Sequence, residues 1–261
     1  MYPHHTQTIQ NVNDYFARDP EVLALLLSGS IAHGFHNENS DVDIMIFLSE
    51  ENYQRHVQTG QVTFFNTELA TYEGGYVDGK YLSLSFVKQV SEKGSEPARF
   101  AFEGAQVLFS RIPGFEEKIC RVAEYPIAEK AERIKRFHAQ LEAWHWYCGE
   151  ALKRGNQYLL GTSVSKLILF GGRLILAHNE MLYPYHKWFL KVLEKAKDKP
   201  ADLMVSIEAL TESPTVENVE AFYQKIKTFQ PWNENPYGWG AQFMLDSELN
   251  WMDGKTPVDD L

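Results

Sequence analysis

The first part of the chain alternates short apolar runs with polar turns. Residues 22–28 (VLALLLS) form one apolar run, and residues 41–48 (DVDIMIFL) form a second run that follows the polar turn 36–40. Residues 62–71 and 81–87 are rich in β-branched and aromatic side chains, which predicts two more strands. The polar stretch 49–58 has helical character. This order of elements predicts a mixed α/β layer.

The pattern changes near Pro113-Gly114, and from Pro126 onward it is mostly helical. Residues 129–152 are amphipathic, whereas residues 159–177 are apolar almost all round, which predicts a buried central helix. Further helices are expected over 183–197 and 217–229. The sequence therefore predicts an α/β (α+β) fold, with a mixed-sheet α/β domain over residues 1–118 and a helical-bundle domain over 119–261.

Composition and charge narrow the possible classes of protein. Of 261 residues, 44% are hydrophobic and 23% are charged, which is typical of a globular chain. The net charge of −10 argues against an extended nucleic-acid partner, although a bound cation would let the chain hold a small phosphorylated ligand. Two cysteines, no basic-then-apolar leader and no uninterrupted membrane-length apolar run favour a cytoplasmic protein with no membrane partner.

The segment from Gly29-Ser30 to Asp41-Val42-Asp43 carries the most specific chemistry. Gly29 permits close approach of a ligand to the backbone, and Ser30 offers an amide and a hydroxyl to a phosphate at a helix start. After ten intervening residues, Asp41 and Asp43 stand two apart at the start of an expected strand, so their side chains share one face. Paired carboxylates suit Mg²⁺ or Mn²⁺, whose remaining ligands are usually water and substrate phosphates.

An Asp-x-Asp pair by itself is more often a solvated turn than a site. Here the pair follows an apolar strand, a Gly-Ser corner and a spacer of ten residues, and this combination favours a metal and phosphate site.

Gly29-Ser30 followed by Asp41-Val42-Asp43 resembles the signature of the DNA-polymerase-beta-type nucleotidyltransferase superfamily. The apolar Leu25-Leu26-Leu27 before it and Ser40 just ahead of the first aspartate also fit. The helical second half is similar in architecture to the antibiotic-modifying branch, which includes lincosamide and aminoglycoside nucleotidyltransferases.

The resemblance implies a nucleotide-transfer reaction. Asp41 and Asp43 would hold Mg²⁺ (or Mn²⁺), and Gly29, Ser30 and Ser40 would bind a nucleoside triphosphate, with ATP the expected donor. A hydroxyl of a small acceptor would attack the α-phosphorus and release pyrophosphate. The resemblance also implies a basic residue from the helical domain on the triphosphate, for which Lys166 is the first candidate, with Lys187 behind it.

The superfamily usually has a third carboxylate on a later strand, and the expected strand 81–87 carries only serines at alternating positions. Glu68 on the preceding expected strand ranks first for this role and for the base, Asp78 in a glycine-flanked turn ranks second, and a real absence ranks third. Arg99 is either a phosphate contact or an exposed helix residue. A zinc site on helix 129–152 is not expected, because His138 and His145 are seven residues apart.

Two other functions remain open at this stage. One is a nucleotide-binding module or pseudoenzyme, which the missing third acid favours, and the other is a transferase that modifies a protein hydroxyl. The chain is expected to be a monomer or a homodimer.

Overall fold

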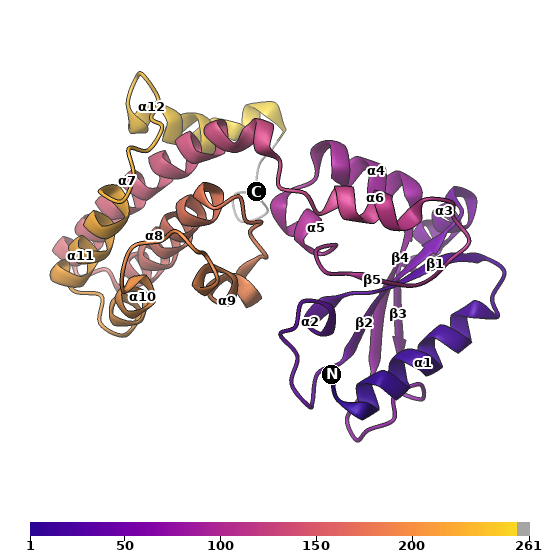
Figure 1. Cartoon of the computed structure of the whole chain (residues 1–261). Coiled ribbons are helices and arrows are strands. Elements are labelled where there is room, and N and C mark those ends of the chain that lie inside the picture. The colour runs from indigo at the N-terminus through magenta and orange to yellow at the C-terminus, as the bar shows by residue number, and fades with distance from the viewer. Residues whose placement is uncertain (255–261) are drawn as a thin grey trace. The chain divides into compact units, whose positions relative to one another are not determined.

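A computed structural model describes residues 1–254 and divides the chain into two compact units, Met1–Glu124 and Tyr125–Leu261 (Figure 1). The boundary expected between 118 and 119 falls within helix α6 (Phe115–Val122). The structure keeps α6 in the first unit, because its Phe115, Ile119 and Val122 are buried in that unit's core.

The first unit is built on a five-stranded sheet in the order β3-β4-β2-β1-β5. Strands β2 and β4 pair in parallel, and the other neighbours pair antiparallel. The strand bounds are β1 Val22–Leu27, β2 Val42–Leu48, β3 Thr63–Asn66, β4 Val77–Ser83 and β5 Gln106–Ser110.

Helices cover both faces of this sheet. On one face, β1 and β2 pack against α1 (Pro3–Ala17) and α3 (Glu50–Thr59), through side chains such as Val12 and Phe16. On the other face they pack against α4 (Leu84–Lys93) and α6. The run 22–27 is apolar throughout because both of its faces are buried. The short helices α2 (Gly29–Ala32) and α5 (Glu96–Phe100) complete the unit.

Two expected strands differ from the observed ones. The strand expected over 62–71 ends at Asn66, where the Asn66 side chain accepts a hydrogen bond from the Leu69 amide and closes a turn. The strand expected over 81–87 is wrong in extent, because β4 begins at Val77 and gives way to helix α4 after Ser83. The alternating apolar residues of 82–86 therefore belong partly to a strand end and partly to a helix start.

The second unit is helical. Its two longest helices, α7 (Lys130–Arg154) and α8 (Gln157–His178), confirm the two long helices expected there, and Gly155 separates them in the left-handed conformation that ends a helix. Helix α11 begins after the cap of Thr215, whose side chain accepts from the Asn218 amide. The remaining helices are α9 Phe189–Glu194, α10 Leu203–Glu212, α11 Val216–Lys227 and α12 Trp239–Phe243, with short turns η1 Ile127–Glu129, η2 His186–Trp188, η3 Met244–Glu248 and η4 Asn250–Asp253.

Helix α8 is, by length and composition alone, apolar enough to cross a membrane. Within residues 1–254 it is the one helix of that kind, and 61% of its most apolar window is buried in the unit. Leu167, Leu174 and Ile175 have no exposed surface. This packing identifies α8 as the core helix of the second unit, as its apolar pattern predicts.

Candidate nucleotide and metal site

Asp41 and Asp43 mark the start of strand β2. Val42 and Ile44 are buried in the core between the sheet and α1, whereas Asp41 and Asp43 stay half-exposed. The alternation of strand β2 therefore sends the Asp43 side chain away from that core and toward the face that carries α4 and α6, whereas Asp41 directly precedes the first residue of the strand. The two aspartates thus lie at the beginning of β2, the central strand of the sheet.

Gly29 makes room for one of these acids. Its φ of +64° is in the left-handed region, and a Cβ on Gly29 would come within 1.7 Å of Oδ2 of Asp43. The backbone at the start of α2 therefore lies directly against the Asp43 carboxylate, which only glycine permits. Ser30 follows at 6% exposure, and its hydroxyl is buried without a hydrogen-bond partner among the described residues.

A third carboxylate lies beside Asp43 on the neighbouring strand. In the parallel pair β2-β4, Asp43 is the register partner of Asp78, so both side chains leave the sheet on the same face. Asp78 is exposed. The charges of all three carboxylates reach Tyr76, where Asp41 first, then burial and Asp43 and Asp78, raise the pKa of the phenol.

The donor set fits a hard divalent cation. Within residues 1–254 no three Asp, Glu, His or Cys side chains form a ready-made metal cluster. Mg²⁺ nevertheless needs only one or two protein carboxylates when substrate phosphates and water supply the other oxygens. Asp41, Asp43 and Asp78 provide such oxygens, and the Asp43 carboxylate lies against the Gly29 backbone.

Comparison with known protein families identifies the segment that contains most of these residues. Residues 10–74 match the family model described as polymerase beta, nucleotidyltransferase, and the match contains Gly29, Ser30, Asp41 and Asp43. The first unit carries a polymerase beta-type nucleotidyltransferase domain.

No curated protein matches the chain significantly. Among solved structures, a nucleotidyltransferase-like protein from Exiguobacterium sibiricum 255-15 is similar at 10% identity, over 98% of this chain and 83% of that one, with a TM-score of 0.49. The family assignment therefore rests on residues 10–74.

In the nucleotidyltransferase domain, two hydrogen bonds to the Ser40 carbonyl hold the loop that precedes Asp41. Nε2 of the buried His5 in α1 donates to the Ser40 carbonyl at 2.9 Å, and the Tyr72 hydroxyl donates to the same oxygen at 2.5 Å. The Ser40 hydroxyl accepts from the Asn37 amide at 2.9 Å. Ser40, predicted to bind nucleotide, thus uses its carbonyl and hydroxyl to shape the loop that leads into β2.

Lys80 is a residue of the nucleotidyltransferase domain that the sequence reading missed. It lies two positions after Asp78 on β4, opposite Met45 and on the face of the acids, and it is exposed. Although the side chain reaches solvent, the protein around it partly desolvates the Lys80 ammonium and thereby lowers its pKa. The charges of Asp43 and Asp78 oppose that shift. Lys80 can be identified from its spacing, because residues two apart on a strand lie on the same face and Asp78 is two residues earlier. The sequence obscures this relation because Asp78-Gly79 resembles a turn.

Glu68, predicted as the third acid and base, lies in the turn after β3 and is exposed. The expectation that it sits on a strand is wrong, because β3 ends two residues earlier, at Asn66. The strand pairing of the nucleotidyltransferase domain brings Asp78, the second-ranked candidate, into line with Asp43 instead.

Arg99 is neither an exposed residue nor a phosphate contact. It is 6% exposed, and its guanidinium donates to the carbonyls of Ser91, Gly94 and Val122. Arg99 therefore ties the ends of α4 and α6 together inside the nucleotidyltransferase domain.

The basic candidates of the helical unit are exposed. Lys166, the first candidate for a triphosphate contact, projects from the exposed side of α8. Arg173 on the same helix lies between two aromatic rings, 4.2 Å from the Phe137 centroid and 4.5 Å from that of Tyr183. Lys187 is exposed in η2.

Proposed function

We propose that the protein transfers a nucleoside monophosphate from a nucleoside triphosphate, with ATP the favoured donor, to a hydroxyl of a small acceptor, and releases pyrophosphate. The observation that carries this proposal is the alignment of Asp43 with Asp78 on parallel strands, directly beside the left-handed Gly29. That arrangement brings carboxylates and the Gly29 backbone together at one point of a domain whose family transfers nucleotides.

The residues of the chain divide into three tasks. Asp41 and Asp43 are proposed to hold Mg²⁺ (or Mn²⁺), which when bound would neutralise charge on the triphosphate and on the leaving pyrophosphate. The Gly29 backbone and the unpartnered Ser30 hydroxyl are proposed to contact phosphate oxygens. Lys80, on the same face as the acids, is proposed to contact the triphosphate as a point charge.

We assign the acceptor side of the reaction to Asp78. Its carboxylate is exposed next to Asp43, so it can take a proton from a hydroxyl that attacks the α-phosphorus or complete the cation's ligands. Glu68 is the competing candidate for the base. Exchange of each acid for its amide separates the two assignments, because the amide keeps the shape and removes the negative charge.

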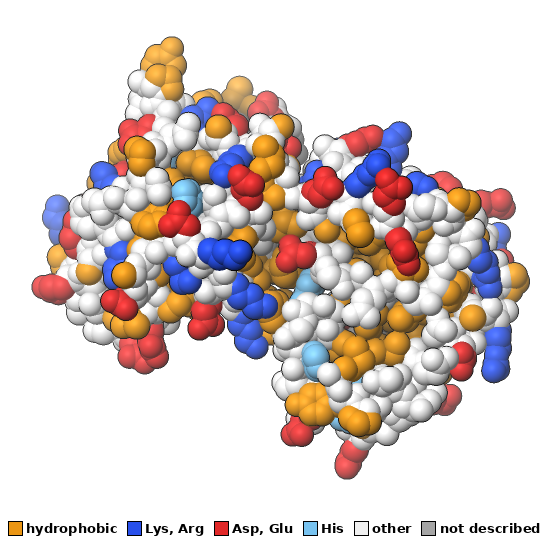
Figure 2. Space-filling view, viewed as in Figure 1, with side chains coloured by type: hydrophobic (Ala, Val, Ile, Leu, Met, Phe, Trp, Pro, Cys, Tyr) orange, Lys and Arg blue, Asp and Glu red, His pale blue; other side chains and the backbone are white. Residues whose placement is uncertain are grey.

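The proposed acceptor class rests on the resemblance to the antibiotic-modifying branch, and the proposed setting rests on composition and charge. We propose a small hydroxylated acceptor, a cytoplasmic location, and a monomer or homodimer, with no membrane and no extended nucleic acid as partner. The net charge of −10 supports the last point. On the face seen in Figure 2, Asp and Glu side chains lie among the Lys and Arg side chains.

Two measurements test the proposal. Calorimetric titration with ATP and GTP in the presence of Mg²⁺ should show binding that falls at least about tenfold in Asp41→Asn and Asp43→Asn, because each loses a cation ligand. Pyrophosphate release with a panel of hydroxylated acceptors should fall about a hundredfold or more in Asp78→Asn and stay near the parent rate in Glu68→Gln.

Asp14→Asn is the matched control, since Asp14 is an exposed carboxylate on α1, where it accepts from the Gln10 side chain. Nucleotide binding that is equal in the parent, Asp41→Asn and Asp43→Asn would contradict the site. Nucleotide binding without pyrophosphate release from any acceptor would favour a binding module, and a labelled protein band in a lysate would favour a protein hydroxyl as acceptor.

A further inference from the structure

The helical unit contains a pocket that the nucleotide-transfer proposal does not use. It lies between α7 and α11, next to the start of α12, and has a volume of about 430 Å³. Small-molecule sites in proteins are commonly about 300–1,000 Å³. All of its lining residues belong to the second unit, so the pocket is complete without the nucleotidyltransferase domain.

The lining combines negative charge with exposed aromatic faces. Two indoles line the pocket, with Trp146 52% exposed and Trp239 38% exposed. The small or aliphatic lining residues come from α7 and α11. No lysine or arginine is among the lining residues, which include one imidazole, that of His145. The three carboxylates of the lining are Glu142, Glu150 and Glu220.

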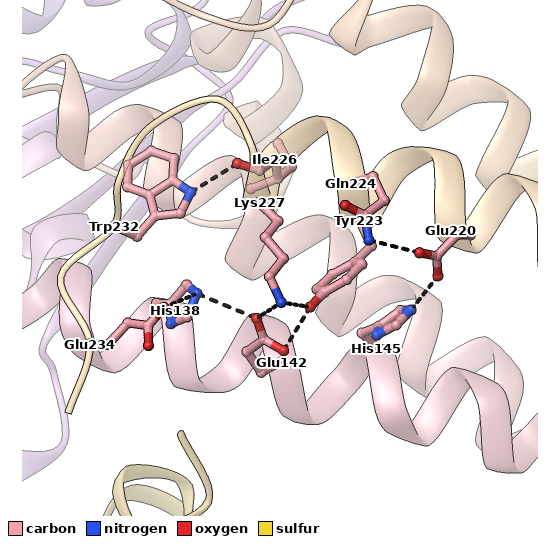
Figure 3. A network of polar contacts seen from close by, with 10 residues as sticks. All are labelled: His138, Glu142, His145, Glu220, Tyr223, Gln224, Ile226, Lys227, Trp232 and Glu234. Carbon is pink, nitrogen blue, oxygen red and sulfur yellow. Dashed lines mark hydrogen bonds and ion pairs between the residues drawn. The ribbon is translucent and has the colours of Figure 1, made fainter. Parts of the chain in front are cut away.

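Internal contacts fix the orientation of two of these carboxylates (Figure 3). Glu142 accepts from the Tyr223 hydroxyl at 2.7 Å and pairs with Lys227 at 3.1 Å. Glu220 contacts Nε2 of His145 at 2.9 Å, and the His145 ring stacks on Tyr223 at 3.7 Å with an interplanar angle of 2°. The pocket wall is therefore preorganised, which lowers the entropic cost of binding.

Glu150 is held from outside the pocket. Its Oε2 accepts from Nε and an Nη of Arg154 at 3.0 and 2.8 Å, and Lys153 lies 4.0 Å from its Oε1. Arg154 and Lys153 are themselves mostly exposed, and neither lines the pocket. A carboxylate has about four acceptor positions, so Glu150 keeps capacity for a ligand that approaches from the pocket side.

We propose that this pocket binds an organic cation, a substituted ammonium with an apolar body of roughly one ring. The ammonium would lie among the carboxylates and near the indole faces, which attract cations through the ring quadrupole. The apolar body would rest on the same indoles. An anion of the same size meets three carboxylates and no lysine or arginine in the lining, so the pocket discriminates by charge.

Intrinsic fluorescence is a direct readout for this site, because all six tryptophans lie in the second unit, at positions 144, 146, 188, 232, 239 and 251. The full-length protein would be titrated with benzyltrimethylammonium, with benzenesulfonate as the anion of similar size and benzyl alcohol as the neutral analogue. Calorimetry would run in parallel. Saturable binding of the ammonium compound alone is the expected result.

Two variants locate the binding. Trp146→Ala removes an exposed indole of the lining, and Glu150→Gln removes a carboxylate charge while keeping its shape. Each should weaken ammonium binding about fivefold or more by calorimetry. The matched controls are Trp251→Ala, an indole with 60% exposure outside the pocket, and Glu117→Gln, an exposed carboxylate paired with Arg121 in the first unit.

The controls should bind the ammonium compound within about twofold of the parent. Absence of saturable ammonium binding would overturn the proposal, as would equal affinity for benzenesulfonate or unchanged affinity in both pocket variants. Since ATP is not used, these outcomes are independent of whether the first unit transfers nucleotides.

Discussion

At the residue scale, Gly29 connects the backbone conformation to the chemistry of the site. Both Gly29 and Gly34 have positive φ, +64° and +72°, but only at Gly29 does an added Cβ meet another group, the Asp43 carboxylate. At Gly34 nothing lies within 4 Å of such a Cβ. A comparison of alanine variants at the two positions therefore distinguishes the free-energy cost of backbone strain from the effect of displacing Asp43.

We predict that Gly34→Ala lowers the free energy of unfolding by about 1–2 kcal/mol, because alanine is strained at positive φ, and that Gly29→Ala lowers it by more, because its Cβ must also displace Asp43. Only Gly29→Ala should also weaken Mg²⁺-ATP binding, by about tenfold or more, since it moves Asp43. Urea unfolding and calorimetry measure the two effects. Equal loss of nucleotide affinity in both variants would contradict the role given to Gly29.

The two cysteines are predicted to differ in reactivity. Burial raises the pKa of the Cys148 thiol to about 12, and the side chain has no exposed surface, whereas Cys120 is exposed. Iodoacetamide at about pH 8 should therefore label Cys120 alone in the folded protein, because the thiolate is the reactive form. Peptide mass mapping checks this, and denaturant should expose both sites; rapid labelling of Cys148 under native conditions would show that α7 opens readily.

Residue-level patterns also explain which parts of the site the sequence could predict. Asp41 and Asp43 were recognisable because the flanking Val42 and Ile44 are buried in alternation with them. Asp78 was read as part of a turn because Gly79 follows it. In the structure Gly79 is a strand residue, and its lack of a side chain lets β4 approach β2, since a Cβ there would lie 2.6 Å from Cγ1 of Ile44.

At the scale of elements, α7 and α11 are joined by a polar network (Figure 3). Glu142 on α7 contacts Tyr223 and Lys227 on α11, and the buried His138 lies 3.4 Å from Glu142 and 3.7 Å from Glu234. The Tyr223 hydroxyl also accepts from Lys227 at 2.6 Å. The pKa of Tyr223 is raised to about 12, chiefly because burial desolvates the phenol. The hydroxyl therefore keeps its proton and remains a donor to Glu142.

Glu142→Gln is predicted to destabilise the second unit by about 1–3 kcal/mol, because it leaves Lys227 without its carboxylate partner. Glu129→Gln, which removes an exposed carboxylate paired with Arg133, should change stability by less than about 0.5 kcal/mol. Urea unfolding followed by tryptophan fluorescence reports this unit. A double-mutant cycle with Lys227→Met should show non-additive losses, and full additivity would argue against a coupled network.

The same network gives a pH dependence. Burial lowers the pKa of His138 from its ordinary value of 6.5, against the opposing charges of Glu142 and Glu234, while Lys227 adds to the lowering. The folded state thus binds a proton at His138 less readily than the unfolded state. The stability contributed by neutral His138 is present above about pH 6.5 and is lost as pH falls toward the folded pKa.

We therefore expect the unfolding midpoint in urea, followed by tryptophan fluorescence, to fall as the pH is lowered below about 6.5. In His138→Gln the slope of stability against pH should be smaller, because that proton-binding difference is gone. An unchanged slope would show that other groups control the acid sensitivity of the second unit. His5, whose pKa burial also lowers, belongs to the first unit and is reported by far-ultraviolet circular dichroism more than by the tryptophans.

Element types were more predictable than strand pairing. The long helices of the second unit can be recognised locally, from the spacing of their apolar residues and from Gly155, which ends α7. In contrast, β5 and the β2-β4 pairing depend on segments that are far apart in the sequence. Apolar alternation over 82–86 suits a strand and a helix start equally well over so few residues, so the boundary at Ser83 is decided by packing against the core.

At the scale of the whole molecule, the two units are predicted to respond to different ligands. Hydrogen exchange followed by mass spectrometry should show that Mg²⁺-ATP slows exchange in α2, β2 and β4, where Gly29, Asp43 and Asp78 lie. Benzyltrimethylammonium should slow exchange in α7 and α11, which line the pocket. Protection by ATP confined to the helical unit would contradict the division of tasks proposed above.

The hydrogen bond from His5 to the Ser40 carbonyl has a practical consequence for anyone who shortens the protein from its N-terminal end. Deleting the first turn of α1 would leave Tyr72 as the sole donor to that oxygen among the described residues, and it would also remove the contact of His4 with the Glu38 carbonyl in the segment that leads to Asp41. Such a trimmed version would lose nucleotide affinity although none of the removed residues is proposed to touch nucleotide.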